Sequence, residues 1–500
     1  MRSKFEMYPD FTAEIKYIDE KGVDTYILAK IIEKHLPNSI YNRGLFDRYT
    51  CVTEGVPIFG RHPRFEEEDD KAVINNRINN DFFSEIVDFK TGYFAGVPIA
   101  YSYSDTKEAK EETADAGDTY SEAEEARDEA SKVLSDFVTL NNMYDVDMET
   151  TKYASICGYS GRLLYLDDGI ERVIPIAPYE CAILSETDIT EPKYAVRYYI
   201  VADINGSEYY NVTFYDSDSI RYYTGTSYSG LSELADKRKV NVYGACPLQG
   251  IPNNKELIGD AEKVISLIDT YDTNISDAAN DLESFSNAYM VIENMPLDDN
   301  EITKMQHSGV LNVNTGVYNG KVYFLTKDMT DTYLSNQLNR VEKNIYRFSK
   351  TPNLNDEAFG TASGVALKFK LTGLEAKCGM FQAKVISAGT YMFKALANAW
   401  GKKKIKVDPL QVVMEFTRNF PLDLLSEAQA VGQLLSTGVV SKRTAMSQLS
   451  FIDDPDYEME LLEEEKNNIP SLLDRVKEDE EDESDNVAED DDEEIKQGDE

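Results

Sequence analysis

Residues 350–406 read KTPNLNDEAFGTASGVALKFKLTGLEAKCGMFQAKVISAGTYMFKALANAWGKKKIK, a polar loop followed by the longest periodic segment of the chain. Apolar or small residues recur there at steps of three and four, which places them on one face of a single helix: Leu367, Leu371, Leu374, Cys378, Phe381, Val385, Ala388, Met392, Ala395 and Ala399. Thr361 or Ser363 can cap the start of this helix, and the lysines after residue 401 suit the negative end of its dipole. At 1.5 Å per residue, roughly 40 residues make a rod about 60 Å long.

Two hypotheses explain what buries the apolar face of this rod. Few compact domains need so long a helix, so we expect neighbouring copies of the chain to cover the face; the expected contact residues are Leu367, Leu371, Leu374, Phe381, Val385 and Met392. The alternative is a long core helix inside a large monomer. The rod also contains Gly364, Gly373, Gly379 and Gly389, each of which costs a helix about 1 kcal/mol relative to alanine. They indicate either the close approach of a neighbouring backbone or a bend.

The composition limits the possible functions of the chain. Its 500 residues suffice for two to four units with their own cores, and the formal net charge is −40. Residues 471–500 contribute −13 of this charge, so the body of the chain is acidic in its own right. A surface that grips nucleic acid needs many lysines and arginines against the phosphates. The charge argues against such a surface, but not against one that DNA slides past.

Several classes of protein are disfavoured by the absence of their signals. The five cysteines are scattered and never spaced as CxxC, so neither a disulfide framework nor a zinc site follows, and a reducing compartment is expected. The first residues lack the apolar core of a signal peptide. No run reaches the roughly 18 uncharged apolar residues of a membrane span. We therefore expect a protein that is made in the cytoplasm and has no membrane partner.

The first half of the chain combines helical and strand patterns. A short helix is expected over residues 23–35, with a polar loop after it through Asn42. A second helix passes through Ile78 and Phe89 and ends at Gly92 to Pro98, before a tyrosine-rich strand. Residues 105–136 are acidic and form either a flexible insertion or a solvated helix, and we favour a loop for their first half.

From residue 155 to residue 223 the hydrophobic period changes to two, which predicts five short strands joined by Asp-Gly, Pro and Asn-Gly turns. Helical patterns return over residues 256–286 and 330–348. Between them lie three strand-like pieces, which begin at Ala288, Gly309 and Lys321. Three short helices are expected after residue 408. The predicted fold class is thus α+β and mainly helical.

Catalytic signatures are scarce. The three histidines are far apart in the sequence, and neither a phosphate-binding GxxxxGK[ST] loop nor a GxGxxG motif occurs. Asp456, Glu464 and Lys466 match the acid and lysine pattern of metal-dependent nucleases only superficially. Lys402, Lys403 and Lys404 could contact phosphate, although a solvated helix end is the simpler explanation, which we favour. We expect no catalytic residue, no metal and no cofactor.

Four segments, in this order, resemble the portal proteins of tailed double-stranded DNA bacteriophages, particularly those with long non-contractile tails. NNRINNDFFSEIVDFKTGYFAGVPIAYSY at residues 75–103 is similar to the family's N-terminal signature. YSGRLLYLDDG and IAPYECAIL at residues 159–184 are similar to its paired wing strands. TPNLNDEAFGTASGVALKFKLTGLEAK at residues 351–377 resembles its Thr-Pro, loop and Ser-Gly-x-Ala-Leu motif, and GVVSKRTAMSQLSFIDDPDYEMELLEEE at residues 438–465 resembles its crown ending. The resemblance covers roughly residues 40–470.

This resemblance implies the portal architecture of wing, stem, clip and crown in a ring with a central tunnel. The implied regions are an N-terminal region and wing at 1–254, stem helices at 255–287 and 330–350, a clip at 288–329, a tunnel loop at 351–362, a long wing helix at 363–407, a crown at 408–469 and a disordered acidic tail at 470–500. The acidic insertion at 105–136 and the acidic tail have no counterpart that we can match.

The resemblance also implies partners and a location. A ring of about twelve copies would sit at one capsid vertex of the virion, after assembly in the host bacterial cytoplasm. It would bind the large terminase subunit, the major capsid and scaffolding proteins and a head-tail adaptor, and would pass double-stranded DNA without reading its sequence. Residues of the tunnel loop would face that DNA, namely Asn353, Asn355, Asp356 and Glu357. The alternative functions are a metal-dependent nuclease and a head-tail adaptor protein.

Overall fold

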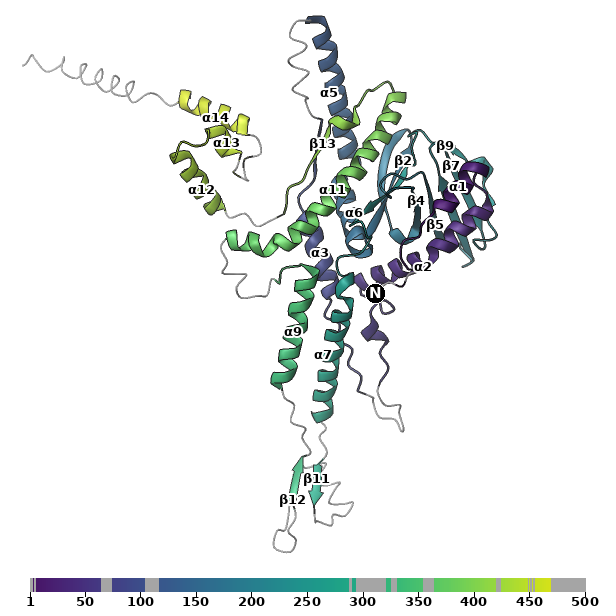
Figure 1. The fold of residues 1–500 in the computed structure, drawn as a ribbon, viewed down its shortest axis with the longest axis vertical. Helices are drawn as coiled ribbons and strands as arrows, with labels where there is room; N and C mark the ends of the chain where they lie inside the picture. Colours follow the sequence, from purple (N-terminus) through teal and green to yellow (C-terminus); the bar gives the residue numbers. More distant parts are fainter. Residues whose placement is uncertain are drawn as a thin grey trace, which may run out of the picture. The chain divides into compact units, whose positions relative to one another are not determined.

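The computed structural model describes residues 3, 6–63, 74–103, 117–286, 290–293, 321–324, 331–353, 364–419, 424–447, 449, 452 and 455–468. The chain divides into two compact units, Met1–Asn419 and Phe420–Glu500. Helices predominate over strands in the described part (Figure 1). The expected α+β, mainly helical class is therefore confirmed.

The first unit contains both helices and sheets. Its helices are α1 (Thr12–Lys21), α2 (Thr25–Tyr49), α3 (Phe82–Ala95), α5 (Gly117–Leu140), α6 (Met143–Cys157), α7 (Ile265–Ser286), α9 (Asp331–Ser349) and α11 (Gly364–Lys402). Its strands are β1 (Ala100–Tyr103), β2 (Tyr159–Asp167), β3 (Ile170–Ile176), β4 (Cys181–Leu184), β5 (Tyr194–Ala202), β6 (Glu208–Tyr215), β7 (Ser219–Gly225), β8 (Ser232–Glu233), β9 (Lys239–Val240), β10 (Leu248–Pro252), β11 (Met290–Glu293), β12 (Lys321–Phe324) and β13 (Val412–Glu415). The second unit contains α12 (Leu424–Ser436), α13 (Lys442–Met446) and α14 (Pro455–Asn468).

The predicted long helix exists as α11, and its apolar face is buried inside the chain's own first unit. None of the face residues with described side chains is more than 4% exposed: Leu371, Leu374, Phe381, Val385 and Met392. Phe381 packs edge-on against Phe94 of α3, with 4.8 Å between ring centroids. The prediction that these residues form the contact between copies is therefore wrong, and the core-helix alternative holds for them. The side chain of Leu367 lies outside the described part of the chain.

The physical reason for this error is that a period of three and four residues shows that a helix face is buried, but not what covers it. The second half of α11 packs with α5, α6 and the three-stranded sheet, in a cluster that includes Phe137, Val146, Leu164, Phe393 and Trp400. That sheet has the antiparallel order β10-β2-β3. Of the glycines in α11, Gly389 lies against the side chain of Met414, whereas Gly379 faces open space.

A larger sheet carries the first two helices on one face. Its order is β4-β5-β6-β7-β8, with β9 also paired to β7. Side chains of α1 and α2 pack on β4 to β7 in one cluster, and a second cluster joins this sheet to the three-stranded one. Figure 1 shows α1 and α2 crossing this part of the molecule.

Helix α2 is longer than predicted. Residues 36–42 were expected to form a loop, yet the helix continues through Pro37 to Tyr49. The amide hydrogen bond lost at Pro37 is offset by buried side-chain contacts just before and after it. His35 Nδ1 lies 2.6 Å from the hydroxyl of Tyr198, and Ser39 Oγ donates to the carbonyl oxygen of Tyr179 at 2.6 Å. Tertiary contacts thus keep α2 continuous despite Pro37.

The strand predictions for residues 155–223 are largely confirmed. The region contains six strands rather than five, because a short turn at Pro178–Glu180 separates β3 from β4. Residues 155–157 end α6 instead of starting a strand. The Asp168-Gly169 turn between β2 and β3 has positive φ at both residues, as a tight hairpin of this kind requires.

The two helices α7 and α9 pack on α3 at one end of the unit. Their shared cluster includes Phe83, Ile86, Val264, Ile268 and Ile345. Helix α7 begins at Ile265, later than the predicted start near residue 256. The strand-like pieces at residues 288 and 321 are confirmed as the antiparallel pair β11–β12. The piece predicted from Gly309 lies outside the described residues.

The acidic segment 105–136 is only partly described. Helix α5 starts at Gly117, and its side chains Ala130, Leu134 and Phe137 are buried against α11. The second part of the segment is therefore a packed helix, and the first part, up to residue 116, lies outside the described residues.

Burial of α11 inside its own chain leads to a matched pair of stability predictions. Phe381→Ala should lower the free energy of unfolding by about 3–5 kcal/mol, because it removes a fully buried ring. Met380→Ala, one residue away on the 56% exposed side, should change it by less than about 0.5 kcal/mol. Urea unfolding followed by circular dichroism measures both values. Equal effects of the two changes would contradict the packing described for α11.

Candidate functional site

A buried group of polar side chains joins α3, α6 and α11 to the segment that enters α7. The Asp260 carboxylate accepts hydrogen bonds at Oδ2 from Lys90 Nζ at 2.7 Å and from Ser155 Oγ at 2.8 Å, and its Oδ1 lies 2.7 Å from Lys377 Nζ. The amide of Asn253 donates to the same Oδ2 at 3.2 Å and accepts a hydrogen bond from Lys90. We call Lys90, Ser155, Asn253, Asp260 and Lys377 the Asp260 cluster.

The electrostatics of this cluster keep its carboxylate ionised. The side chains of Lys90 and Asp260 are each 2% exposed, and that of Lys377 is 17% exposed. Burial alone would raise the pKa of Asp260, but the ammonium groups of Lys90 and Lys377 outweigh burial and hold this pKa well below its usual range. Lys90 Nζ also lies 4.5 Å from the centroid of the Phe381 ring. Such a cluster holds the elements that it joins in place. It is unsuited to proton transfer near neutral pH, because its carboxylate stays ionised there.

The same cluster ties the end of α9 to α11. Lys377 Nζ donates to the carbonyl oxygen of Ser349, the last residue of α9, at 2.7 Å. The chain then turns at Lys350, which has a φ of 62°, and Thr351 is buried. Asn353 Nδ2 donates back to Glu342 Oε1 of α9 at 3.0 Å. The path of the chain after α9 is therefore fixed up to residue 353.

A second polar contact holds α11 to the chain that follows β13. Arg418 makes a two-pronged contact with Glu375 of α11, with Nε to Oε2 at 3.0 Å and Nη2 to Oε1 at 3.1 Å. Tyr93 of α3 donates to the same carboxylate at 3.0 Å. Paired hydrogen bonds of this kind are strong and directional. Helix α11 is thus fixed to α3 at two points, the Asp260 cluster and the contact between Glu375 and Tyr93.

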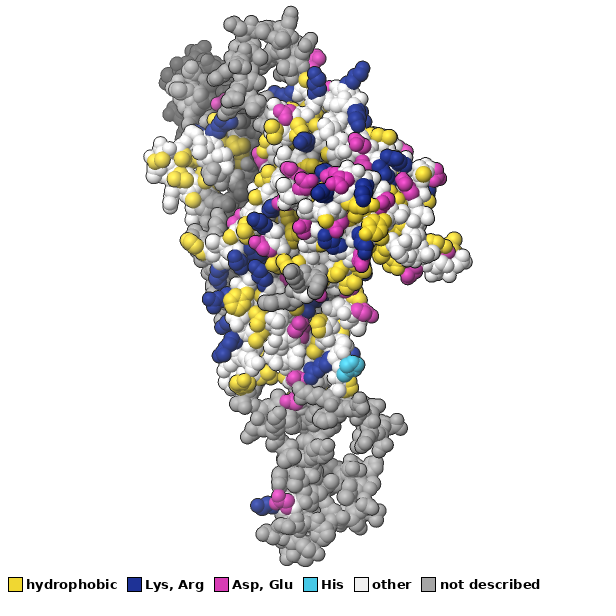
Figure 2. All heavy atoms as spheres, turned by 45° about the vertical axis from the view of Figure 1, so that its right-hand side comes forward, with side chains coloured by type: hydrophobic (Ala, Val, Ile, Leu, Met, Phe, Trp, Pro, Cys, Tyr) yellow, Lys and Arg dark blue, Asp and Glu magenta, His cyan; other side chains and the backbone are white. Residues whose placement is uncertain are grey.

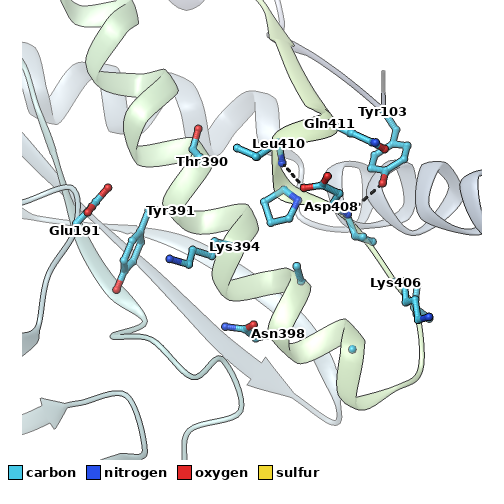
Figure 3. A pocket seen from close by; sticks show the side chains of 15 residues that line it. Tyr103, Glu191, Thr390, Tyr391, Lys394, Asn398, Lys406, Asp408, Leu410 and Gln411 are labelled. Atoms are coloured by element: carbon cyan, nitrogen blue, oxygen red, sulfur yellow. Dashed lines mark hydrogen bonds between the residues drawn. The ribbon is translucent and has the colours of Figure 1, made fainter. Parts of the chain in front are cut away.

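A cavity lies beside the last turns of α11 (Figure 3). It has a volume of about 950 Å³, and Lys394 and Asn398 of α11 line it together with Asp408 and Leu410 of the following chain. The amide of Asp408 donates to the hydroxyl of Tyr103 at 3.1 Å, and the amide of Leu410 donates to the Asp408 carboxylate at 3.0 Å. The lining combines apolar and polar groups without an arrangement of nucleophile and base.

The three lysines predicted as phosphate contacts lie at the end of α11. Lys402 Nζ donates to the carbonyl oxygen of Val242 at 2.7 Å, and Lys403 Nζ lies 2.7 Å from Glu171 Oε1. Lys404 is exposed and has a φ of 70°. Two of the three ammonium groups therefore bind the chain itself, which fits the simpler interpretation of a helix end.

The predicted tunnel-loop residues are only partly described. Asn353 is half-buried against α9 through its bond to Glu342, whereas Asn355, Asp356 and Glu357 lie outside the described residues. Their role facing DNA stays a prediction.

The residues of the nuclease pattern lie on one helix, and the side chains of Asp456, Glu464 and Lys466 lie outside the described part of the chain. Asp456 and Glu464 are eight residues apart on the single helix α14, so their backbones are about 12 Å apart along the axis. Carboxylates that share one ion must each approach it to within about 2.0–2.6 Å. Within the described ranges, no three His, Cys, Asp or Glu side chains are placed to hold a metal ion. None of the helices in the described part is long and apolar enough to cross a membrane.

The Asp260 cluster was not predicted from the sequence. One signal was available, because Lys90 interrupts the apolar run of α3 and Lys377 precedes the buried Cys378 on α11. A lysine beside a buried helix face needs a carboxylate partner. The sequence alone could not identify Asp260 as that partner, because 91 acidic residues compete for the role.

Comparisons of the sequence with known proteins identify a family that this chain matches. The sequence profile described as "Phage portal protein, SPP1 Gp6-like" matches residues 10–471. The chain is 24% identical over 483 residues to the portal protein of Bacillus phage SPP1, which covers 91% of this chain and 89% of that protein. It is also 24% identical over 439 residues to the portal protein of Clostridium phage phiCD119, which covers 84% of this chain and 90% of that protein.

The Asp260 cluster leads to a prediction about stability and pH. Asp260→Asn leaves the buried Lys90 and Lys377 without a counter-charge, so the free energy of unfolding at pH 7 should fall by about 3–5 kcal/mol. Because the pKa of Asp260 is lower in the folded state than its ordinary value of about 3.9, its stabilisation is present above that value and lost as the pH falls below it. The variant should therefore lose less stability than the wild type between pH 5 and pH 3.

Urea unfolding midpoints at these pH values check the prediction. Asp236→Asn, an exposed position in the turn between β8 and β9, serves as the matched control and should leave both quantities unchanged. A wild-type stability at pH 7 in Asp260→Asn would show that the cluster does not hold the helices together.

Proposed function

This chain belongs to the phage portal protein family of the SPP1 Gp6-like type, and from that premise we propose that it is a subunit of the portal vertex of a tailed double-stranded DNA bacteriophage. The observation that carries the proposal is the family match over residues 10–471, which spans nearly the whole described chain. The order of elements agrees with it: a helix, a small β module, a helix and then the long helix α11.

The proposed assembly is a closed ring of about twelve copies around an axial tunnel. The ring conducts double-stranded DNA into the capsid during packaging and out of it during ejection. A ring closes when each copy joins the next through two different surfaces, so every subunit must carry two complementary faces. The ring sits at one vertex of the virion and is assembled in the cytoplasm of the host bacterium.

We assign the regions of this ring to the elements of the fold. Helices α7 and α9 are the proposed stem, the residues between them at 288–329 the clip, and residues 351–362 the tunnel loop. Helix α11 is the spine of the wing, within residues 363–407, and residues 408–469 are the crown. Residues 1–254 supply the rest of the wing. The Asp260 cluster then lies where stem and wing meet, because it links α9 and the start of α7 to α11.

The proposed partners follow from this role. The clip is the docking site for the large terminase subunit during packaging and for a head-tail adaptor afterwards, and the outer surface contacts the major capsid and scaffolding proteins. No membrane partner and no cofactor are proposed. DNA is bound without regard to sequence.

The charge of the chain suits a conduit for DNA. Each lysine or arginine that binds a phosphate releases counterions and deepens the energy well that holds the duplex. With a net charge of −40, most of the surface repels the duplex instead of binding it. In the proposed tunnel loop, Asn353, Asn355, Asp356 and Glu357 offer polar groups that touch the DNA backbone weakly.

Two measurements test the proposal together. We expect purified full-length protein to form particles with rotational symmetry in electron micrographs, and native mass spectrometry to give a mass of about twelve subunits. The physical reason is that a subunit with two complementary faces reaches its lowest free energy when no face is left open. Monomers or dimers at every salt concentration tested would contradict the proposal and favour the head-tail adaptor or nuclease alternatives.

A further inference from the structure

The surface of α9 that points away from its own chain is basic. Three cations lie at spacings of three or four residues, which places them on one helix face, namely Arg340, Lys343 and Arg347; a fourth, Lys350, follows directly after the last residue of the helix. All four are exposed, and no acidic side chain lies on this face among the described residues. We call these four residues the basic face.

The basic face lies opposite the buried face of the helix. Val341, Ile345 and Tyr346 pack against α3 and α7, and at about 100° per residue Arg340, Lys343 and Arg347 fall on the other side of α9. In the described part of the chain, no carboxylate forms an ion pair with any of the four. Figure 2 shows dark blue side chains gathered along one edge of the described surface, below its middle. In a chain of net charge −40, such a concentration needs an explanation.

Exposed apolar groups beside the basic face favour a protein as its partner. Phe348 is 55% exposed, and Met380 of α11 is 56% exposed. Phe348 and Met380 line one concave surface of about 420 Å³, together with Lys350. Aromatic residues, methionine and arginine are enriched where proteins meet, whereas a surface along which DNA slides gains nothing from exposed phenyl rings.

The exposed side of α7 has the complementary character. Helix α7 contains five acidic residues and no lysine or arginine. Its outer face consists of small polar residues followed by carboxylates, namely Ser266, Thr270, Thr273, Asp277 and Asp281, which we call the acidic face. The hydroxyls of Thr270 and Thr273 donate to carbonyl oxygens of their own helix at 2.7 Å. The side chains of Thr270 and Thr273 are small, and their hydroxyl groups need no further hydrogen-bond partner.

We propose that the basic face of α9 in one copy packs against the acidic face of α7 in the next copy. The long stems of the arginines and lysines lie across the small threonines, and their charged ends reach the carboxylates. Asp277 can take part while it keeps its ion pair with Arg61, because its side chain is 31% exposed and a carboxylate accepts several hydrogen bonds. This inference rests on the proposed ring and identifies the surfaces that close it.

The arrangement of the two helices in one subunit supports this pairing. Helices α7 and α9 pack side by side and run in opposite directions, so both faces extend along the same length of the unit (Figure 1). One subunit thus offers a basic face through α9 and an acidic face through α7. A contact between two different faces, repeated around an axis, generates a ring when the rotation closes.

A charge-reversal experiment in full-length protein tests the proposal. The first variant carries Arg340→Glu, Lys343→Glu and Arg347→Glu, and the second carries Thr270→Lys and Thr273→Lys. Each variant alone places like charges at the contact, so we expect the fraction of subunits in rings to fall at least tenfold at low salt. A third chain with all five changes places the glutamates opposite the lysines and should recover rings. Native mass spectrometry measures the ring fraction in each case.

A matched control separates this contact from net charge. Lys16→Glu, Lys21→Glu and Lys132→Glu change the same number of exposed cations on α1 and α5, and should leave the ring fraction unchanged. Thermal unfolding by circular dichroism should give similar midpoints for all variants, because the changed side chains are exposed.

The outcomes distinguish the possible errors. Wild-type protein that never forms rings would overturn the proposed function and this inference with it. Wild-type rings that persist in the first and second variants would overturn only this inference. Unchanged rings with reduced retention of linear double-stranded DNA in the first variant would instead place the basic face on the channel wall. Loss of rings in both variants without recovery in the third would show that the faces do not meet each other.

Discussion

The buried ion contacts of Asp260 are the constraint on which the rest of the structure depends. A single carboxylate contacts the ammonium groups of Lys90 and Lys377, and Lys377 also holds the last carbonyl group of α9. Breaking such a buried contact leaves an uncompensated charge in a medium of low polarity. The cluster therefore fixes where α7 begins, where α9 ends and how both meet α11. Two glycines permit the close crossing beside it, since a Cβ at Gly158 or Gly259 would overlap the neighbouring backbone.

This constraint decides which surfaces remain for neighbouring copies. The apolar side of α11 is used inside the chain, with Phe381 and Met392 fully buried. A ring cannot use that surface without opening the core of each subunit. Among the surfaces that stay available are the outer sides of α7 and α9, the two helices that pack on α3. They differ in charge, and that difference gives a subunit two unlike sides, as a closed ring requires.

The sequence predicted those features that depend on local periodicity or turn chemistry. Helices α9 and α11, strands β5, β6 and β7, the Asp168-Gly169 hairpin and the β11–β12 pair all appear where the pattern placed them. The predictions from the sequence were wrong where tertiary contacts decide which structure a segment adopts. The continuation of α2 past Pro37 depends on hydrogen bonds to Tyr198 and Tyr179, which lie more than 130 residues away along the chain. The partner of the α11 face was misjudged because periodicity carries no information about which surface covers a helix. For the candidate site, the sequence pattern named Asn353 as a residue of the tunnel loop but did not predict its hydrogen bond to Glu342 of α9, and Asp260 and its two lysines were not foreseen at all.

The most direct test of these ideas is a reconstruction of the assembled particle by electron cryomicroscopy at side-chain detail. We expect a closed ring in which the apolar face of each α11 stays inside its own subunit while α9 of every copy lies against α7 of the next. A map in which α11 enters the core of a neighbouring chain would contradict this arrangement of the subunits. So would a map in which Arg340, Lys343 and Arg347 face solvent or the channel.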